Sequence, residues 1–83
     1  MGQSSGYKIR KIREIKNISR EYMAKHLGIS RRAYSYIEKD KVKIDEKQLM
    51  RIAAALKVKT DVIENFNVQT VFKLWLSVVY EDN

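Results

Sequence analysis

The side chains of this sequence that can do chemistry are mostly cationic. Seventeen Lys and Arg residues stand against ten Asp and Glu residues, which leaves a formal net charge of +7 on 83 residues. With no Cys and one His, the chain has no thiol chemistry and cannot build a zinc site of His and Cys ligands. Cationic side chains attract anions and donate hydrogen bonds to them, so the composition predicts a polyanionic partner.

These cations are concentrated in the first half of the chain. Through Lys43, twelve basic and four acidic residues give a net charge of +8, whereas from Ile44 onward five basic and six acidic residues give −1. Charge that only keeps a protein in solution would be shared between the halves, whereas a binding surface concentrates it. We therefore expect the binding surface in the first half.

Other classes of function find little support in the sequence. No pair of nucleophile and base, no metal cluster and no phosphate-binding glycine loop can be assembled from these residues, so we expect no enzymatic activity and no cofactor. The start of the chain is polar and is followed by Lys8 and Arg10, where a secretory signal would be apolar. We expect a cytoplasmic protein without a membrane partner.

Cap residues divide the first half of the chain into three short helices. The apolar spacing from Tyr7 predicts a first helix that ends near Asn17, because Asn tolerates the left-handed backbone that stops a helix. Ser19 is a candidate N-cap for a second helix, which Gly28 ends. Ser30 is the next candidate N-cap and predicts a third helix that continues to Glu38.

The second half predicts two more helices. Residues 39–43 interrupt the apolar pattern and predict a basic loop. Asp45 is a candidate N-cap for a fourth helix, and a short fifth helix is expected from Thr60. The fourth helix has an apolar stripe that should face the core, formed by Leu49, Ile52, Ala53 and Leu56.

The second and third helices form a helix-turn-helix pattern. Small Ala24 lets the two helices pack closely, Gly28 permits a chain reversal at positive φ, and Ser30 accepts from the exposed N–H groups of the third helix. Alone, this pattern is moderately specific, since many helical hairpins contain a Gly at the bend.

Residues 67–83 are rich in apolar residues, but their periodicity does not decide between a helix and a strand. Their apolar positions fit one face of a helix and nearly fit the alternation of a strand. Two roles are favoured for this segment: it folds back over its own domain, or it forms a homodimer interface. A membrane-surface helix is a poorer third option, since Lys73 is the one basic residue of the segment. We expect one domain in residues 1–66 and an additional segment in 67–83.

The wider spacing resembles one family. The sequence between Ile9 and Ile63 is similar to the phage repressor and Cro type of helix-turn-helix domain, the XRE family. The positions that carry this resemblance are Arg13, the run from Ser19 to Ser30, Ile37, Glu38, Leu49, Ile52, Ala53 and Leu56. It implies an all-α, five-helix, lambda-repressor-like domain that binds double-stranded DNA, with the C-terminal segment added as a helix or a strand.

The resemblance also implies roles for individual residues. The third helix enters the major groove in this family, which makes Arg31, Arg32, Ser35 and Tyr36 the candidates for base contacts. The forked guanidinium of Arg can donate two hydrogen bonds to guanine, so we expect G-containing half-sites. Candidates for phosphate contacts, which position a protein without reading sequence, are Arg20, Ser30, Lys39, Lys41 and Lys43.

Arg13 and Glu38 match a pair that the family uses as a structural ion pair, so we exclude Arg13 from DNA contact. The chain departs from the family at Tyr34, whose hydroxyl needs a partner, and at Asp40 and Lys57, where the family has Gly. Ile44 stands where the family has Pro. We expect a sequence-specific regulator, a repressor that acts as a homodimer by occupying an operator. The alternative is an antitoxin or interaction module whose C-terminal segment binds another protein.

Overall fold

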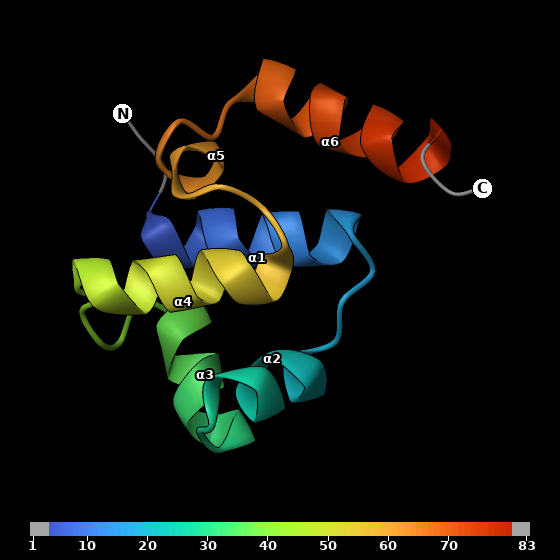
Figure 1. The fold of residues 1–83 in the computed structure, drawn as a ribbon. Helices are drawn as coiled ribbons and strands as arrows, with labels where there is room; N and C mark the ends of the chain where they lie inside the picture. Colours follow the sequence, from blue (N-terminus) through green and yellow to red (C-terminus); the bar gives the residue numbers. More distant parts are fainter. Residues whose placement is uncertain (1–3, 81–83) are drawn as a thin grey trace.

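A computed structural model describes residues 4–80, apart from the side chains of Val68 and Thr70. Across this range the chain forms six α-helices and no strand (Figure 1). This architecture confirms the predicted all-α fold class, and the C-terminal segment, whose type the sequence left open, forms a helix. The helices are α1 (Ser5–Ile15), α2 (Arg20–Leu27), α3 (Arg31–Glu38), α4 (Glu46–Leu56), α5 (Thr60–Glu64) and α6 (Val68–Tyr80).

Three of these helices begin at the N-cap residues predicted from the sequence, which are Ser19, Ser30 and Asp45. Ser19 Oγ accepts from the N–H of Tyr22 at 2.9 Å at the start of α2. Asp45 Oδ1 accepts from the N–H of Gln48 at 2.8 Å, and the Gln48 side chain accepts in return from the N–H of Asp45, which makes a capping box at the start of α4. Each cap satisfies an N–H group that the first helical turn leaves without a partner.

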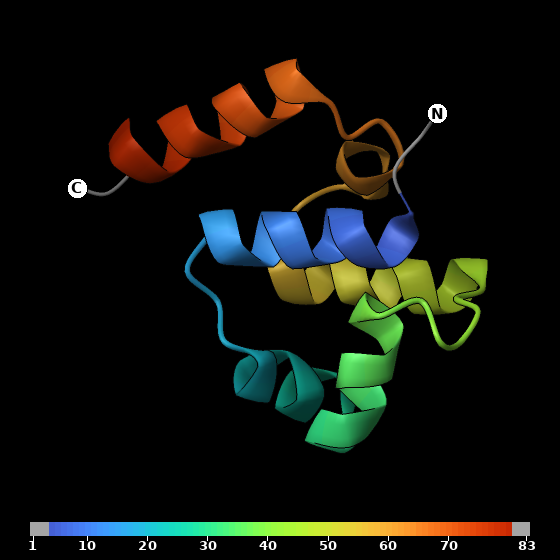
Figure 2. The same cartoon turned by 180° about the vertical axis from the view of Figure 1, so that it is seen from behind.

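The helices form layers around one core. α1 and α4 occupy the middle of the molecule, α2 and α3 lie on one side of them, and α5 and α6 lie on the other (Figures 1 and 2). The largest fully buried side chains come from five of the helices and are Ile9, Ile12, Met23, Tyr34, Ile52, Leu56 and Ile63. The helix-turn-helix therefore sits at one end of the domain, on a support formed by α1 and α4.

Helix α6 crosses α1 at the opposite end of the molecule. Its inner side packs Leu74 against the core. Its outer side leaves Phe72 57%, Trp75 52%, Val79 45% and Tyr80 73% exposed. The rings of Phe72 and Trp75 stack with their centroids 6.3 Å apart. The segment thus covers its own domain with one face and presents an apolar surface with another.

Two of the departures from the family adopt the backbone that glycine would favour. Asp40 has φ 58° and Lys57 has φ 61°, both in the left-handed region. The Asp40 side chain also forms a hydrogen bond, in which Asp40 Oδ1 accepts from the N–H of Gly6 at 3.0 Å at the start of α1. Gly6 itself is tightly enclosed, since a Cβ atom there would lie 2.5 Å from the carbonyl oxygen of Glu38.

Candidate nucleic-acid interface

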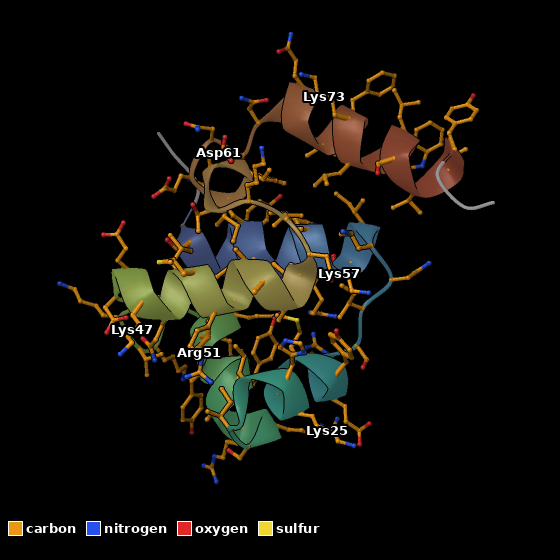
Figure 3. The ribbon with its side chains drawn as sticks, in the orientation of Figure 1. Lys25, Lys47, Arg51, Lys57, Asp61 and Lys73 are labelled. Atoms are coloured by element: carbon orange, nitrogen blue, oxygen red, sulfur yellow. The ribbon has the colours of Figure 1, made fainter. Side chains whose placement is uncertain are left out.

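The turn between α2 and α3 is held by contacts from three elements. Gly28 ends α2 in the left-handed conformation with φ 71°, and Ser30 Oγ accepts from the N–H of Ala33 at 3.0 Å to begin α3. Arg51 of α4 donates to the carbonyl oxygen of Leu27 at 3.1 Å, and it lies between α4 and the helix-turn-helix in Figure 3. No local sequence pattern points to Arg51, because its partner lies 24 positions away.

The outward face of α3 carries the four candidates for base contacts. Arg31 and Arg32 are exposed, Ser35 and Tyr36 are partly exposed, and Tyr34 on the inner face is fully buried. This arrangement follows from helical spacing, since residues four positions apart lie one above the other on a helix, which pairs Arg31 with Ser35 and Arg32 with Tyr36. The amino-terminal end of α3 therefore presents two guanidinium groups to the surroundings.

A hollow on this face brings candidates for base and phosphate contacts together. It is lined by residues of α2 and α3 and by the residue that follows α3, namely Arg20, Arg31, Arg32, Ser35 and Lys39. Four of the five side chains are cationic, and the fifth has a hydroxyl donor. Such a surface attracts anions and can donate several hydrogen bonds to them, as a DNA backbone requires.

Two cations of the interface lie close to Tyr36. Arg32 Nε donates to the Tyr36 hydroxyl oxygen at 3.0 Å, and the Arg32 guanidinium lies 5.8 Å from the centre of the Tyr36 ring. Lys41 Nζ, from the loop after α3, lies 5.9 Å from the same ring centre. Both distances are within the range of a cation–π interaction.

The basic loop, residues 39–43, comes directly after α3 in the chain and leads toward α4. Lys39, Lys41 and Lys43 are all exposed. The N–H of Lys41 donates to the carbonyl oxygen of Tyr36 at 2.9 Å, which closes the C-terminal end of α3. Two of the three lysines predicted to contact phosphate thus lie beside the outward face of α3, since Lys39 lines the hollow and Lys41 lies near the Tyr36 ring.

Beneath the interface, Arg13 and Glu38 form the ion pair that the resemblance implies. Arg13 Nε lies 2.6 Å from Glu38 Oε2, and Arg13 Nη2 donates to Glu38 Oε1 at 3.2 Å. Burial alone would lower the pKa of Arg13, but the hydrogen bond and the charge of Glu38 outweigh it and raise that pKa. The remaining Nη1 donates to the carbonyl oxygen of Ile18 at 2.9 Å.

Two further residues share Glu38. The Tyr34 hydroxyl donates to Glu38 Oε2, so the polar atom of this buried ring has its partner. Burial raises the pKa of Tyr34, and the hydrogen bond to Glu38 and its negative charge raise it further. Arg20 Nε lies 3.5 Å from Glu38 Oε1 although half of the Arg20 side chain is exposed. Arg20 therefore connects the buried ion pair to the cationic hollow.

Several cations of α1 are engaged elsewhere in the domain. Lys8 Nζ donates to the carbonyl oxygen of Glu64 and Lys16 Nζ to that of Lys57, each at 3.3 Å. Lys11 Nζ lies 3.7 Å from Glu14 Oε1. The charge of the first half is thus divided between the α3 face and cations in and beside α1, of which Lys8 and Lys16 contact neighbouring elements and Lys11 contacts its own helix.

The structure and the comparisons define the class. Two short helices joined at a left-handed glycine, the second with exposed arginines at its amino-terminal end, form a helix-turn-helix domain. The family model described as "Helix-turn-helix" matches residues 9–63, and the chain belongs to this family, the XRE type of Cro and C1 repressors. The protein is thus a DNA-binding transcription regulator in the general sense. No curated protein and no solved structure matched the chain.

Two features of the described residues bear on other functions. Between residues 4 and 80, no group of three or more His, Asp or Glu side chains is placed to hold a metal ion. None of the helices in the same part of the chain is both long and apolar enough to cross a membrane.

Proposed function

We propose that the protein is a sequence-specific regulator that binds double-stranded DNA and represses transcription by occupying an operator. In this proposal residues 1–66 bind DNA, and α3 enters the major groove with Arg31 and Arg32 at the base edges. The observation that carries it is the pair of exposed arginines at the start of α3, beside a hollow lined by four cations. Arg reads guanine well, because two of its N–H groups can donate to O6 and N7 together.

The remaining cations of the interface have a positioning role in this proposal. Arg20, Lys39, Lys41 and Lys43 contact phosphates on either side of the groove. Ser30 joins them, because the oxygen that caps α3 still carries a hydrogen to donate. The positive end of the α3 dipole supports the same arrangement, since it favours an anion at the start of the helix.

Selection of bound duplexes from a random pool, at one stated salt concentration, tests the proposal. The expected result is an enriched motif with guanine in each half-site, which the double variant Arg31→Ala, Arg32→Ala fails to enrich. Lys73→Ala is the matched control, because it removes one cation from α6 at the far end of the molecule (Figure 3). Strong retention of DNA without any enriched motif would contradict the proposal, since a +7 protein binds any DNA at low salt.

We also propose that residues 67–83 form a homodimer interface through the outer face of α6. The exposed parts of Phe72, Trp75, Val79 and Tyr80 amount to about 450 Å² per copy, since an aromatic side chain contributes roughly 150–250 Å². A pair would bury about 900 Å², close to the lower limit of about 1,000 Å² for a specific interface. Two linked domains can read half-sites about 34 Å apart, which adds avidity to a weak dimer.

The position of α6 supports this choice of partner. α6 lies on the far side of α1 from the helix-turn-helix, and its C-terminal half extends past the end of α1 (Figures 1 and 2). A second copy that packs there leaves α3 uncovered.

Sedimentation equilibrium tests the dimer. The expected result is a dimer at micromolar concentration that Trp75→Glu dissociates and Lys73→Ala preserves. A wild-type protein that stays monomeric at every accessible concentration would contradict it. If that monomer also binds a second protein through Trp75, the alternative of an antitoxin or interaction module is favoured instead.

A further inference from the structure

The ring of Tyr36 is the point where the base-reading and phosphate-binding parts of the interface meet. Its hydroxyl oxygen accepts from Arg32 Nε at 3.0 Å, one helical turn earlier on α3. Its ring lies 5.8 Å from the guanidinium of Arg32 and 5.9 Å from Lys41 Nζ. The main chain also connects Lys41 to Tyr36, because the N–H of Lys41 donates to the carbonyl oxygen of Tyr36 at 2.9 Å.

This contact uses the part of Arg32 that guanine reading does not need. A hydrogen bond from Nε leaves both terminal nitrogens, Nη1 and Nη2, available to donate to O6 and N7 of one guanine. The side chain of Arg is long, and ordering it at an interface opposes binding. A guanidinium held in place before DNA arrives loses less conformational freedom when it binds.

We propose that Tyr36 is a positioning residue that orients Arg32 for guanine, and that it does not read a base itself. The assignment rests on the proposed function and deepens it. The contacts of Tyr36 that support this assignment are the hydrogen bond it accepts from Arg32 and the approach of Arg32 and Lys41 to its ring. Its hydroxyl still carries a hydrogen to donate, so the variants below distinguish positioning of Arg32 from a separate base contact.

Two substitutions separate the parts of this contact. Tyr36→Phe removes the hydroxyl and keeps the ring, whereas Tyr36→Leu removes both. Tyr22→Phe is the matched control, because Tyr22 is an exposed tyrosine on α2 whose ring lies beside that of His26, with centroids 5.5 Å apart. All these positions are at least partly exposed, and unfolding curves of the variants establish that each one folds.

The first measurement uses the free protein. The Nε–H resonance of Arg32, observed by nitrogen-edited NMR, should exchange with water more slowly in the wild type than in Tyr36→Phe, and Tyr22→Phe should leave it unchanged. Equal exchange rates in the wild type and Tyr36→Phe would overturn the assignment. This result does not depend on any DNA sequence, so it is independent of the proposed function.

The second measurement compares two duplexes, a selected one and the same one with its Arg32-dependent G·C pair replaced by A·T. The preference for guanine should fall about fivefold in Tyr36→Phe, the effect of one hydrogen bond, and further in Tyr36→Leu. In an Arg32→Ala background, Tyr36→Phe should have no additional effect, because the two residues act as one unit.

Additive effects of Tyr36→Phe and Arg32→Ala would overturn the assignment and indicate a separate base contact by Tyr36. An undiminished guanine preference in Tyr36→Phe would overturn it as well. A wild-type protein without any base preference would instead overturn the proposed function, and the assignment with it.

Discussion

At the scale of single residues, Asp40 and Lys57 adopt the same backbone for different reasons. Both have φ near 60°, a conformation that side chains with a Cβ atom disfavour. Asp40 uses its carboxylate to accept from the N–H of Gly6, which joins the end of α3 to the start of α1. Lys57 ends α4 through its main-chain N–H, which bonds to Ala53 and Ala54 carbonyl oxygens, a contact that any residue there can make.

Replacement by glycine should therefore have different effects on the free energy of unfolding at these two positions. Lys57→Gly should raise the free energy of unfolding by about 0.5–1 kcal/mol, because glycine relieves the left-handed strain. Asp40→Gly should give no gain, since it relieves the same strain but removes a hydrogen bond that contributes about 1 kcal/mol. Urea unfolding of both variants measures this difference. An equal gain at both positions would show that the Asp40 carboxylate does not stabilise the fold.

At the scale of elements, Glu38 joins the first three helices. It lies at the end of α3, pairs with Arg13 of α1 and lies near Arg20 of α2, and it also accepts from Tyr34 of its own helix. Removing Arg13 would leave the buried Glu38 charge with only the half-exposed Arg20 as a cationic partner, which is costly. The orientation of α3, and with it the whole outward face, depends on this cluster.

The Tyr34 phenol should make part of this stability depend on pH. Its pKa is raised in the folded protein, so the folded state keeps a proton that the unfolded chain releases above about pH 10. The stabilisation is complete below about pH 10 and declines above it. The stability difference between wild type and Tyr34→Phe should therefore narrow by about 1 kcal/mol per pH unit above pH 10. Urea unfolding of the wild type and Tyr34→Phe at pH 8 and 11 measures this difference in the free energy of unfolding. A difference that stays constant with pH would contradict the role of the phenol.

The helices that begin or end at local signals could be predicted from the sequence, because Ser19, Gly28, Ser30 and Asp45 act on their own neighbours. The type of α6 could not, since its apolar residues suit two periodicities and packing on α1 decides between them. Of the long-range contacts, the Arg13–Glu38 pair could be predicted only through the family resemblance, and those of Arg51 and Asp40 could not be predicted at all. Arg51 meets its partner across 24 positions and Asp40 across 34, separations at which no spacing rule applies.

At the scale of the whole molecule, the cationic side chains behind the net charge of +7 fall into groups with different roles. Two lysines bond to carbonyl oxygens of neighbouring elements, Lys8 and Lys16. Lys11 pairs with Glu14 of its own helix, α1. Arg13 is internal. The cations that remain in the first half include those of the α3 face and the loop after it, while α6 at the opposite end carries an apolar surface. The candidate nucleic-acid interface and the exposed apolar face of α6 thus lie at opposite ends, which suits the proposed DNA contact and the proposed dimer contact.

The basic loop should contribute to affinity but not to sequence preference. Replacing Lys39, Lys41 and Lys43 together by Ala should weaken binding to all duplexes similarly. It should also lower the slope of log affinity against log salt by about 0.9 for each phosphate that the variant no longer neutralises. Titrations at several salt concentrations, with Lys73→Ala as the control, measure the slope. A changed base preference would show that one of these lysines reads sequence.

The central claim is that Arg31 and Arg32 on α3 read base edges while the other cations position the DNA. The most direct test is the ratio of affinities for a selected duplex and for a scrambled duplex of the same length, at one salt concentration. The expected wild-type ratio is about a thousandfold or more. The Arg31→Ala, Arg32→Ala variant should lose most of this ratio, mainly through weaker binding to the selected duplex. A wild-type ratio near one, or a ratio that the double variant retains, would contradict the account.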